Sequence, residues 1–287
     1  EILRCLVGSE MCIRDSFNIM SNLEVGYTFD QYDKSDYQSL YKNDVRDYSN
    51  VQHNVHALYN YTFNGKHTLT VGADYLRDYL MSYQFTDNAD HTMHTADAFG
   101  QFDWNPTERL NVIAGLRFDY FSDSNVRHLS PHLGMMYKIG NCSLRGSYSQ
   151  GFRSPTLKEM YMVFNMANMM MIYGNPDLKS ETSHNFSVSA EYTKSRYNFS
   201  ITGYYNLVHN RINTVYSEDP KGQIYTNTDK MDIAGIDANV SAKYPCGLGY
   251  RLSYTYIHEF MRDGQKKFTD TRPHTATVCL LYTSPSP

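Results

Sequence analysis

Residues 182–193 read TSHNFSVSAEYT. Apolar or aromatic side chains at Phe186, Val188, Ala190 and Tyr192 alternate there with polar ones. In an extended chain successive side chains point to opposite faces of the sheet, so a period of two residues gives one apolar and one polar face. This stretch therefore predicts a β-strand that lies between an apolar and a wet environment.

The same alternation recurs along most of the chain. Apolar side chains occupy every second position from Leu110 to Tyr120, and again from Tyr197 to Ile201. Strands are predicted at 17–29, 50–63, 66–85, 94–105, 108–121, 128–139, 142–152, 181–194, 196–209, 223–244, 248–261 and 271–281.

The predicted connections alternate in length. Short turns are expected at Asn64-Gly65, Asn105-Pro106-Thr107, Gly140-Asn141, Ser195 and Pro245-Cys246-Gly247. Asn-Gly is a preferred hairpin turn, since both residues tolerate positive φ. Longer polar loops are expected near 30–49, 86–93, 122–127, 153–180, 210–222 and 262–270. Short turns at one end and long loops at the other are typical of an outer-membrane barrel. The predicted fold is all-β, an antiparallel transmembrane β-barrel.

Composition agrees with this fold. The 287 residues include 26 Tyr and 14 Phe but a single Trp. Tyr is common in β-strands that are half buried, and aromatic residues near strand ends are common at a membrane interface. The formal charge of −4 gives no excess of positive charge of the kind that nucleic-acid binding requires. Mean hydropathy is −0.55. No run of about 18 apolar residues is present, which excludes a helical membrane protein.

The two ends of the chain differ from the rest. Residues 1–16 (EILRCLVGSEMCIRDS) and 279–287 (CLLYTSPSP) resemble translated sequencing adapters of the kind left in metagenomic assemblies. Natural, disordered termini are the alternative. We expect two non-native tails, at 1–16 and 279–287, around a partial barrel at 17–278. Residues 1–16 are predicted to form no strand.

A distinctive motif lies between the seventh and eighth predicted strands. Residues 151–182 read GFRSPTLKEMYMVFNMANMMMIYGNPDLKSET. This pattern resembles that of TonB-dependent outer-membrane receptors, whose usual form is close to GFRAPTLKELY followed by NPDLKPE. Ser154 and Ser180 replace the usual Ala and Pro. Asn227 with residues 234–237 (AGID), and residues 272–274 (RPH), resemble two later segments of the family.

The resemblance implies a 22-stranded up-and-down barrel with an N-terminal plug domain, in the outer membrane of Gram-negative bacteria. Such receptors import scarce nutrients of the iron–siderophore, haem or cobalamin class, with energy delivered through TonB. The implied partners are outer-membrane lipid, a metal chelate or similar small ligand, and the TonB complex through a plug absent from this chain. The twelve strands predicted from the alternation would be about 12 of these 22. Its two unpaired edges would not be tolerated in lipid, so we expect no transport by the chain alone.

The motif has a physical interpretation of its own, as the base of the longest loop. Pro155 removes a backbone donor and ends the strand ladder. The sequence Asn175-Pro176-Asp177 is typical of a turn. We also expect the side chains of Arg153 and Asp177 to form an ion pair. A direct ligand role is the alternative. The residues assigned to the loop base are Phe152, Arg153, Ser154, Pro155, Asn175, Pro176, Asp177 and Leu178.

Methionines crowd the segment between the two motif halves. Methionine is soft and adaptable, which suits a large apolar ligand or a soft metal; a loop packed on its own side chains is the alternative. The candidate ligand contacts are Met160, Met162, Met166, Met169, Met170, Met171 and Tyr173. No His lies between Pro155 and Asn175, which weakens a haem assignment. His91 and His94 are weak candidates for a metal.

No enzyme is predicted. The chain has no G-x-S-x-G, H-E-x-x-H or P-loop motif. Ser149, Ser154 and His184 are residue types of a barrel-rim triad, but nothing in the sequence orients them. No cofactor is predicted. Two other classes stay open: a passive porin-like or structural barrel, and a soluble β-sandwich that binds carbohydrate.

Overall fold

The computed structural model describes the backbone of residues 2–18, 20–38, 42–85, 90–122, 125–166, 170–260 and 272–282, and in these ranges the side chains from residue 20 onward except those of residues 38, 166 and 229. These residues form a 15-stranded sheet and one short helix. The elements are β1 (Ile2–Asn18), β2 (Ser21–Gln38), β3 (Asn43–Phe63), β4 (His67–Ser82), β5 (Asp90–Trp104), β6 (Leu110–Phe121), β7 (Val126–Ile139), β8 (Cys142–Arg153), α1 (Leu157–Tyr161), β9 (Val163–Met166), β10 (Met170–Tyr173), β11 (Glu181–Lys194), β12 (Tyr197–Glu218), β13 (Lys221–Lys243), β14 (Leu248–Phe260) and β15 (His274–Tyr282). The prediction of about 12 strands was too low by three, which are β1, β9 and β10.

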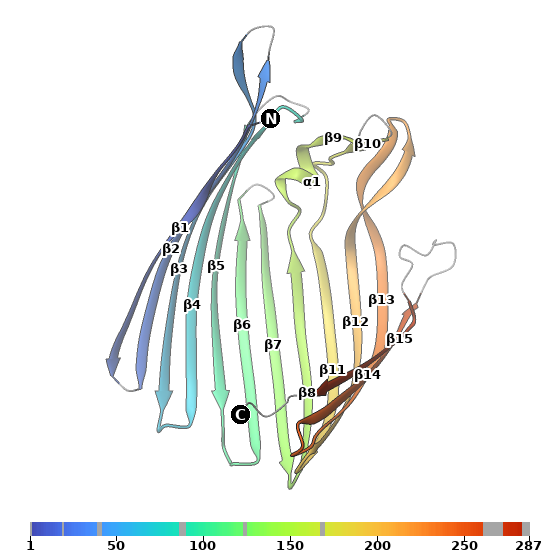
Figure 1. Cartoon of the computed structure of the whole chain (residues 1–287). Helices are drawn as coiled ribbons and strands as arrows, with labels where there is room; N and C mark the ends of the chain where they lie inside the picture. Colours follow the sequence, from blue (N-terminus) through green and yellow to red (C-terminus); the bar gives the residue numbers. More distant parts are fainter. Residues whose placement is uncertain are drawn as a thin grey trace.

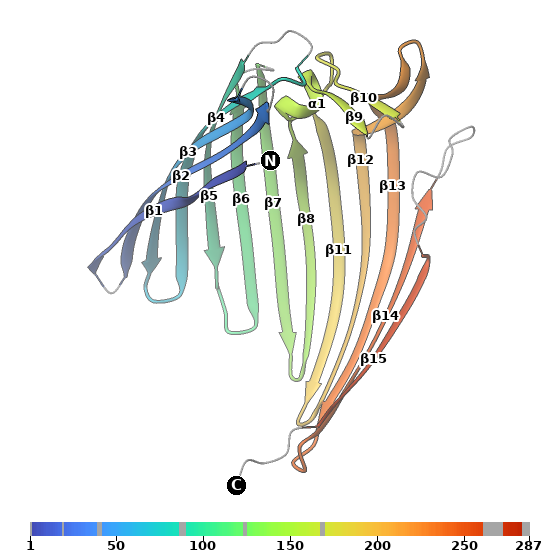
Figure 2. The same ribbon diagram turned by 45° about the horizontal axis from the view of Figure 1, so that its top comes forward.

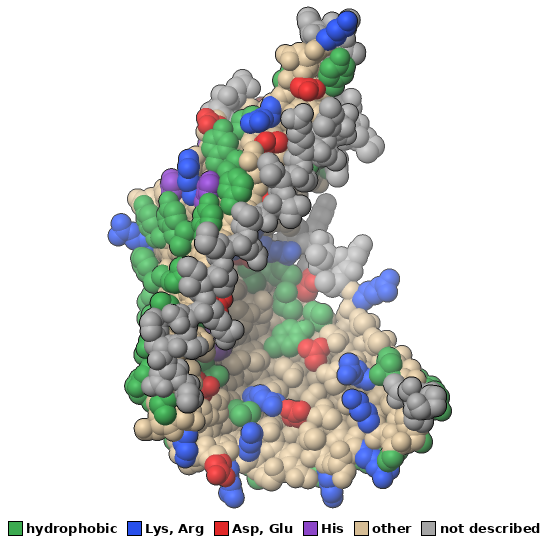
Figure 3. Space-filling model, turned by 60° about the vertical axis from the view of Figure 1, so that its left-hand side comes forward, with side chains coloured by type: hydrophobic (Ala, Val, Ile, Leu, Met, Phe, Trp, Pro, Cys, Tyr) green, Lys and Arg blue, Asp and Glu red, His purple; other side chains and the backbone are tan. Residues whose placement is uncertain are grey.

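The main sheet follows chain order. Strands β1 to β8 and β11 to β15 each pair antiparallel with the next strand of the series. The sheet curves into a trough with a hollowed inner side (Figures 1, 2 and 3). Within the described strands, β1 pairs only with β2 and β15 only with β14, so the trough is not closed. The predicted all-β, antiparallel barrel architecture is confirmed.

The two faces of the sheet differ as the alternation predicts. On one face large apolar side chains are exposed, with Val188 at 71% and Leu133 at 52%. Figure 3 shows hydrophobic side chains gathered along the outer surface of the trough. On the other face Arg117 lies 2.9 Å from carboxylate oxygens of both Asp97 and Asp119. An apolar outer face and a polar inner face are the reverse of a soluble domain and typical of a barrel in lipid. No helix among the described residues is long and apolar enough to cross a membrane.

The five predicted short turns are confirmed, all at the lower end of the strands in Figure 1. Asn64 and Gly65 both have positive φ, at 50° and 64°. Gly140 and Ser195 start two-residue turns with φ of 59° and 50°. Glycine and asparagine tolerate this conformation well. The turn chemistry therefore fixes which strand ends form the short-turn side of the barrel.

Three sequence predictions about strand extent are wrong. Residues 2–16 lie in β1, which pairs with β2 through the backbone ladder, and the strand expected at 17–29 is divided between β1 and β2. The loop expected at 30–49 is mostly strand, since β2 runs to Gln38 and β3 begins at Asn43. The loop expected at 210–222 is also mostly strand, since β12 ends at Glu218 and β13 begins at Lys221. The loop expected at 262–270 lies outside the described residues.

The physical reason is visible in the upper part of β2 and β3. These strands project beyond the apolar surface, so both of their faces are polar and no alternation is needed. The ladder is supported by cross-strand polar contacts instead. Ser49 Oγ donates to Asp33 Oδ1 at 2.6 Å, and Arg46 lies 3.5 Å from the same carboxylate. Tyr32 packs edge-on against Tyr48.

Candidate functional site

The chain between β8 and β11 forms a compact assembly at the end of the sheet opposite the short turns (Figures 1 and 2). We call residues 154–180 the loop assembly. The β8–β11 ladder ends at the pair Arg153 and Glu181. Pro155 lies two residues further along the chain than Arg153 and is fully buried. Because proline has no backbone N–H, it cannot continue the ladder, and the chain leaves the sheet here.

The helix α1 begins with a capping box. Thr156 Oγ1 accepts from the Glu159 N–H at 3.3 Å, and Glu159 Oε2 accepts from the Thr156 N–H at 2.9 Å. Such a reciprocal pair satisfies two backbone donors at the start of a helix. The same Glu159 carboxylate accepts from Arg153 Nη1 at 2.9 and 3.0 Å. One carboxylate thus joins the last residue of β8 to the first turn of α1.

The expected pair between Arg153 and Asp177 is not formed. Arg153 binds Glu159 and lies 3.6 Å from Glu181. The Asp177 backbone N–H donates to Asn175 Oδ1 at 3.0 Å, which makes an Asx-type turn. The prediction was wrong because the capping box directs the Glu159 carboxylate toward the Arg153 guanidinium, so Glu159 pairs with Arg153 in place of Asp177.

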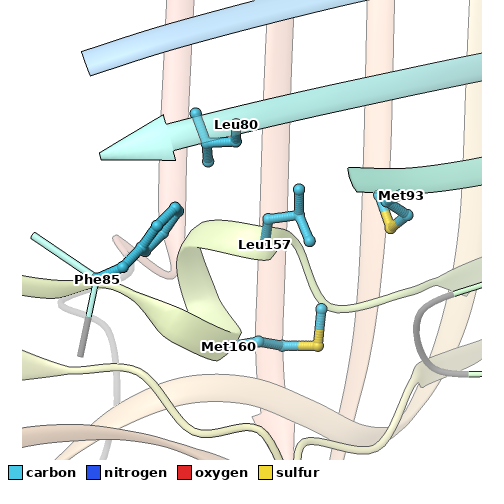
Figure 4. Packing of buried hydrophobic residues seen from close by; sticks show 5 residues of the cluster. All are labelled: Leu80, Phe85, Met93, Leu157 and Met160. Carbon is cyan, nitrogen blue, oxygen red and sulfur yellow. The ribbon is translucent and has the colours of Figure 1, made fainter. Parts of the chain in front are cut away.

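The buried face of α1 packs against the β4–β5 side of the mouth. Leu157 and Met160 are 2% and 3% exposed and form a cluster with Leu80, Phe85 and Met93 (Figure 4). Burial of apolar side chains stabilises such a contact by roughly 1.5–3 kcal/mol for each large residue. The helix is therefore anchored to strands that are far away in sequence.

Aromatic and backbone contacts extend the same anchor. Tyr161 stacks on His91 with ring centroids 3.9 Å apart. The Val163 N–H donates to Gln84 O at 2.7 Å. The segment that follows α1 is thus tied to the chain between β4 and β5 by both side chains and backbone.

On its other side the loop assembly is joined to β13. The β9–β10 hairpin pairs in parallel with β13 through Ile172 and Gln223. Close approach within the assembly requires Gly174, because a Cβ there would lie 2.7 Å from the Met160 carbonyl oxygen. The loop assembly is therefore bonded to β4–β5 on one side and to β13 on the other.

The second motif half is fastened to β13 by amide side chains. Asn175 Nδ2 donates to Tyr225 O at 3.0 Å. The Lys179 N–H donates to Asn227 Oδ1, and Asn227 Nδ2 donates to Lys179 O, both at 2.7 Å. Asn227 Nδ2 also donates to Asn210 O at 2.8 Å. A single side chain thus links three backbone segments.

The structure gathers the predicted loop-base residues at this one end of the sheet. Ser154 and Leu178 are buried, at 8% and 7% exposure, and Phe152 stacks on His128 with centroids 4.2 Å apart. The motif residues end the β8–β11 ladder and hold the loop assembly above it. We call the hydrogen bonds that Asn175 and Asn227 make between the loop assembly and β13 the clamp.

The predicted ligand contacts are in different environments. Met160 is buried in the cluster under α1, whereas Met162, Met170, Met171 and Tyr173 are partly exposed. Phe164, which the sequence did not single out, is 41% exposed on the same hairpin. Met169 and the side chain of Met166 lie outside the described residues.

The two candidate metal ligands are not brought together. His91 stacks on Tyr161, and His94 bonds to the Tyr75 hydroxyl at 2.7 Å. Since they are three positions apart on β5, their side chains are on opposite faces of the sheet. In the described part of the chain, no group of three or more His, Cys, Asp or Glu residues has the arrangement of a metal site.

Two elements of the site escaped the sequence analysis. The capping box had a readable signal, the T-x-x-E spacing of Thr156 and Glu159 ahead of apolar residues. The need for glycine at Gly174 had none, because it depends on contact with Met160 across the loop assembly.

An antiparallel sheet with an apolar outer face, a polar inner face and short turns at one end defines the class of outer-membrane β-barrels. A family model described as TonB dependent receptor-like, beta-barrel matches residues 13–286. The chain therefore belongs to the TonB-dependent receptors, which are located in the Gram-negative outer membrane. This family consists of transport receptors rather than enzymes, and it agrees with the resemblance seen in the motif at 151–182.

Curated relatives match parts of the chain. The iron-regulated outer membrane virulence protein of Vibrio cholerae is 27% identical over 220 residues, which cover 70% of this chain and 33% of that protein. The vitamin B12 transporter BtuB of Photobacterium profundum is 32% identical over 111 residues, 37% of this chain and 17% of that protein. The chain thus spans a third or less of the length of these relatives.

Solved structures share the fold. The siderophore receptor PirA from Pseudomonas aeruginosa superposes with a TM-score of 0.69 at 15% identity, covering 88% of this chain and 56% of that one. A ferric enterobactin receptor, PfeA, in complex with BCV-L6 gives 0.71 at 16% identity, covering 95% and 47%.

Proposed function

We propose that this chain is the barrel segment of a receptor that imports a scarce nutrient across the outer membrane, with energy delivered through TonB. The ligand is a metal chelate of the iron–siderophore, haem or cobalamin class, and a siderophore is favoured. The names of the relatives support this preference, since one is iron-regulated and two structural neighbours are siderophore receptors. Cobalamin stays among the candidate ligands, because one relative is named as a vitamin B12 transporter.

The observation that supports a receptor role best is the double attachment of the loop assembly. A passive pore needs only an open mouth, whereas here α1 packs against β4–β5 and β10 pairs with β13. A segment held at both sides presents a defined surface, and preorganised surfaces lose less entropy on binding. Met162, Met170, Met171 and Tyr173 lie on this segment and are the proposed ligand contacts.

A growth test identifies the nutrient. A strain that lacks its own receptors is given a receptor containing this chain and is grown on single iron or cobalamin sources. Growth on one ferric siderophore, and on none of the others, is the expected result. Growth that is independent of the added receptor would contradict the proposal.

The proposed contacts have a separate test. Met170→Ser combined with Met171→Ser is expected to weaken binding of that chelate about tenfold, because apolar contact is lost at two partly exposed side chains of β10. Met136→Ser, on β7 near the short turn at Gly140, is the matched control and should bind as the unaltered receptor does. Equal affinity of the double variant and the control would rule out these contacts.

The chain alone, with β1 and β15 as edges that have no further partner among the described strands, is not proposed to transport. A heat-resistant, protease-protected barrel formed in detergent by the isolated segment 17–278 would contradict this.

A further inference from the structure

A row of basic side chains crosses the outer face of the sheet. In the register of β3, β4 and β5, His53 pairs directly with Arg77, and Arg77 pairs directly with His94. Directly paired residues share a face of the sheet, with Cβ atoms about 4.5–5.5 Å apart. The same face carries the exposed Val55 and Val71, so the row is on the apolar, outer side.

The row lies at a defined height. His53 and His94 each precede the first residue of the next short turn, Asn64 and Asn105, by 11 residues. His184 on β11 precedes Ser195 by the same 11 residues. A strand that crosses a membrane uses about 9–11 residues. All three histidines are therefore placed where their strands leave the hydrocarbon on the side opposite the short turns.

Between the row and the turns the outer face is apolar or aromatic. Below His94 it carries Ala96, Ala98, Gly100, Phe102 and Trp104 on β5. Figure 3 shows histidine and Lys or Arg side chains next to one another among the hydrophobic side chains of the outer surface. The length of strand below the row therefore places the row near the border of the lipid-facing surface.

Each histidine of the row is oriented by a tyrosine. Tyr27 Oη lies 2.8 Å from His53 Nδ1, and Tyr75 Oη lies 2.7 Å from His94 Nδ1. Tyr148 holds His184 in the same way at 3.0 Å. In each pair the tyrosine is diagonal to the histidine across two neighbouring strands. When Nδ1 accepts the phenol proton, Nε2 carries the ring proton as a donor.

Charge on this face is one-sided. The outward positions of β3, β4 and β5 from the row down to the turns include no acidic residue, and Asp90 is four positions beyond His94 on β5. Arg127 adds a further cation, with its guanidinium 5.8 Å from the Tyr120 ring centroid on the adjoining pair of strands. Cations at a membrane border reach toward the anionic headgroups.

We propose that His53, Arg77 and His94 bind the phosphate groups of phosphorylated glycolipid in the outer leaflet of the membrane. Arg77 supplies a permanent charge with several N–H donors, and the two tyrosine-oriented imidazoles supply a donor on either side. This surface is separate from the loop assembly, and the inference does not depend on which nutrient the receptor imports.

The test uses a receptor that contains this chain, purified in detergent, and lipid A as the probe in its bisphosphorylated and enzymatically dephosphorylated forms. Arg77→Gln is expected to weaken binding of bisphosphorylated lipid A about fivefold, which corresponds to about 1 kcal/mol for one cation near an anionic surface. Arg77→Lys should retain most of the binding. Dephosphorylated lipid A should bind weakly, and with equal affinity, to the unaltered receptor and to both Arg77 variants.

The matched control is Arg251→Gln. Arg251 is also an exposed arginine, but it lies on β14 and on the inner face of the sheet, opposite to the face that carries Arg77. It should bind bisphosphorylated lipid A as the unaltered receptor does. Equal binding of the two lipid A forms to the unaltered receptor would overturn the proposal without any variant. A loss in Arg251→Gln as large as that in Arg77→Gln would also overturn it.

Discussion

Asn227 on β13 and Lys179 in the loop assembly exchange two hydrogen bonds, one in each direction, both 2.7 Å long. This exchange fixes the end of the loop assembly against a strand 48 residues further along the chain. Together with the hydrogen bond from Asn175 to Tyr225, it holds the second half of the motif at the barrel mouth.

Replacing this amide tests the clamp. Asn227→Ala removes the bonds to Lys179 and Asn210, each worth about 1 kcal/mol net, so we expect residues 175–180 to open far more often. Amide hydrogen exchange should rise there by at least tenfold, while β11 stays protected. Asn227→Asp keeps the acceptor for the Lys179 N–H and should show an intermediate effect. Unchanged exchange in Asn227→Ala would show that the clamp does not depend on this side chain.

Glu159 has two roles that two substitutions separate. Glu159→Gln keeps a capping box but loses the charge that pairs with Arg153, so we expect a small loss of helix protection. Glu159→Ala loses both and should destabilise α1 by about 1–2 kcal/mol. The readout is hydrogen exchange at the amides of residues 156–160. Equal effects of the two substitutions would mean that the ion pair, not the cap, holds the helix.

The glycine between β10 and the second motif half is predicted to be intolerant of a methyl group. Gly174→Ala places a Cβ 2.7 Å from the Met160 carbonyl oxygen, so the backbone at residue 174 must shift away from α1. We expect faster proteolysis of residues 160–175. Gly203→Ala is the control, since no atom lies within 4 Å of its added Cβ. Cleavage of the two variants at the same rate would contradict the close packing.

The projecting part of β2 and β3 should respond to pH. Burial, together with the neighbouring Asp36, raises the pKa of Asp47 above its usual range. A carboxyl whose pKa is raised on folding favours the folded hairpin when protonated, so this contribution is lost as pH rises through the folded pKa. Hydrogen-exchange protection of residues 43–49 should therefore increase on acidification from pH 7. Asp47→Asn should increase protection at pH 7 and remove that acid-induced gain; a gain of the same size in this variant would exclude Asp47 as its source.

Much of the fold was predictable because its determinants are local. The alternation at 182–193 and the turns at Asn64-Gly65 and Gly140-Asn141 each depend on a few adjacent residues, and the structure confirms them. The projecting strands at 30–38 and 211–218 were missed because their apolar and polar residues do not alternate, so no period of two can be detected there.

The site was predictable only in part, for a similar reason. The motif at 151–182 identified the loop and its place in the chain. The partner of Arg153 was not identified, because Asp177 and Glu159 are both acidic and only the geometry of the capping box decides between them. The contact of Met160 with Leu80 and Phe85 joins segments about 75–80 residues apart, and no local pattern reveals it.

If this barrel belongs to an energy-coupled importer of a metal chelate, uptake of the chelate must depend on TonB, and this dependence can be measured. Cells with a receptor containing this chain are given ⁵⁵Fe-labelled siderophores or labelled cobalamin, in strains that differ only in TonB. We predict that one chelate accumulates in the strain with TonB and only binds at the surface in the strain without it. Equal accumulation in both strains would show a passive pore and contradict the account.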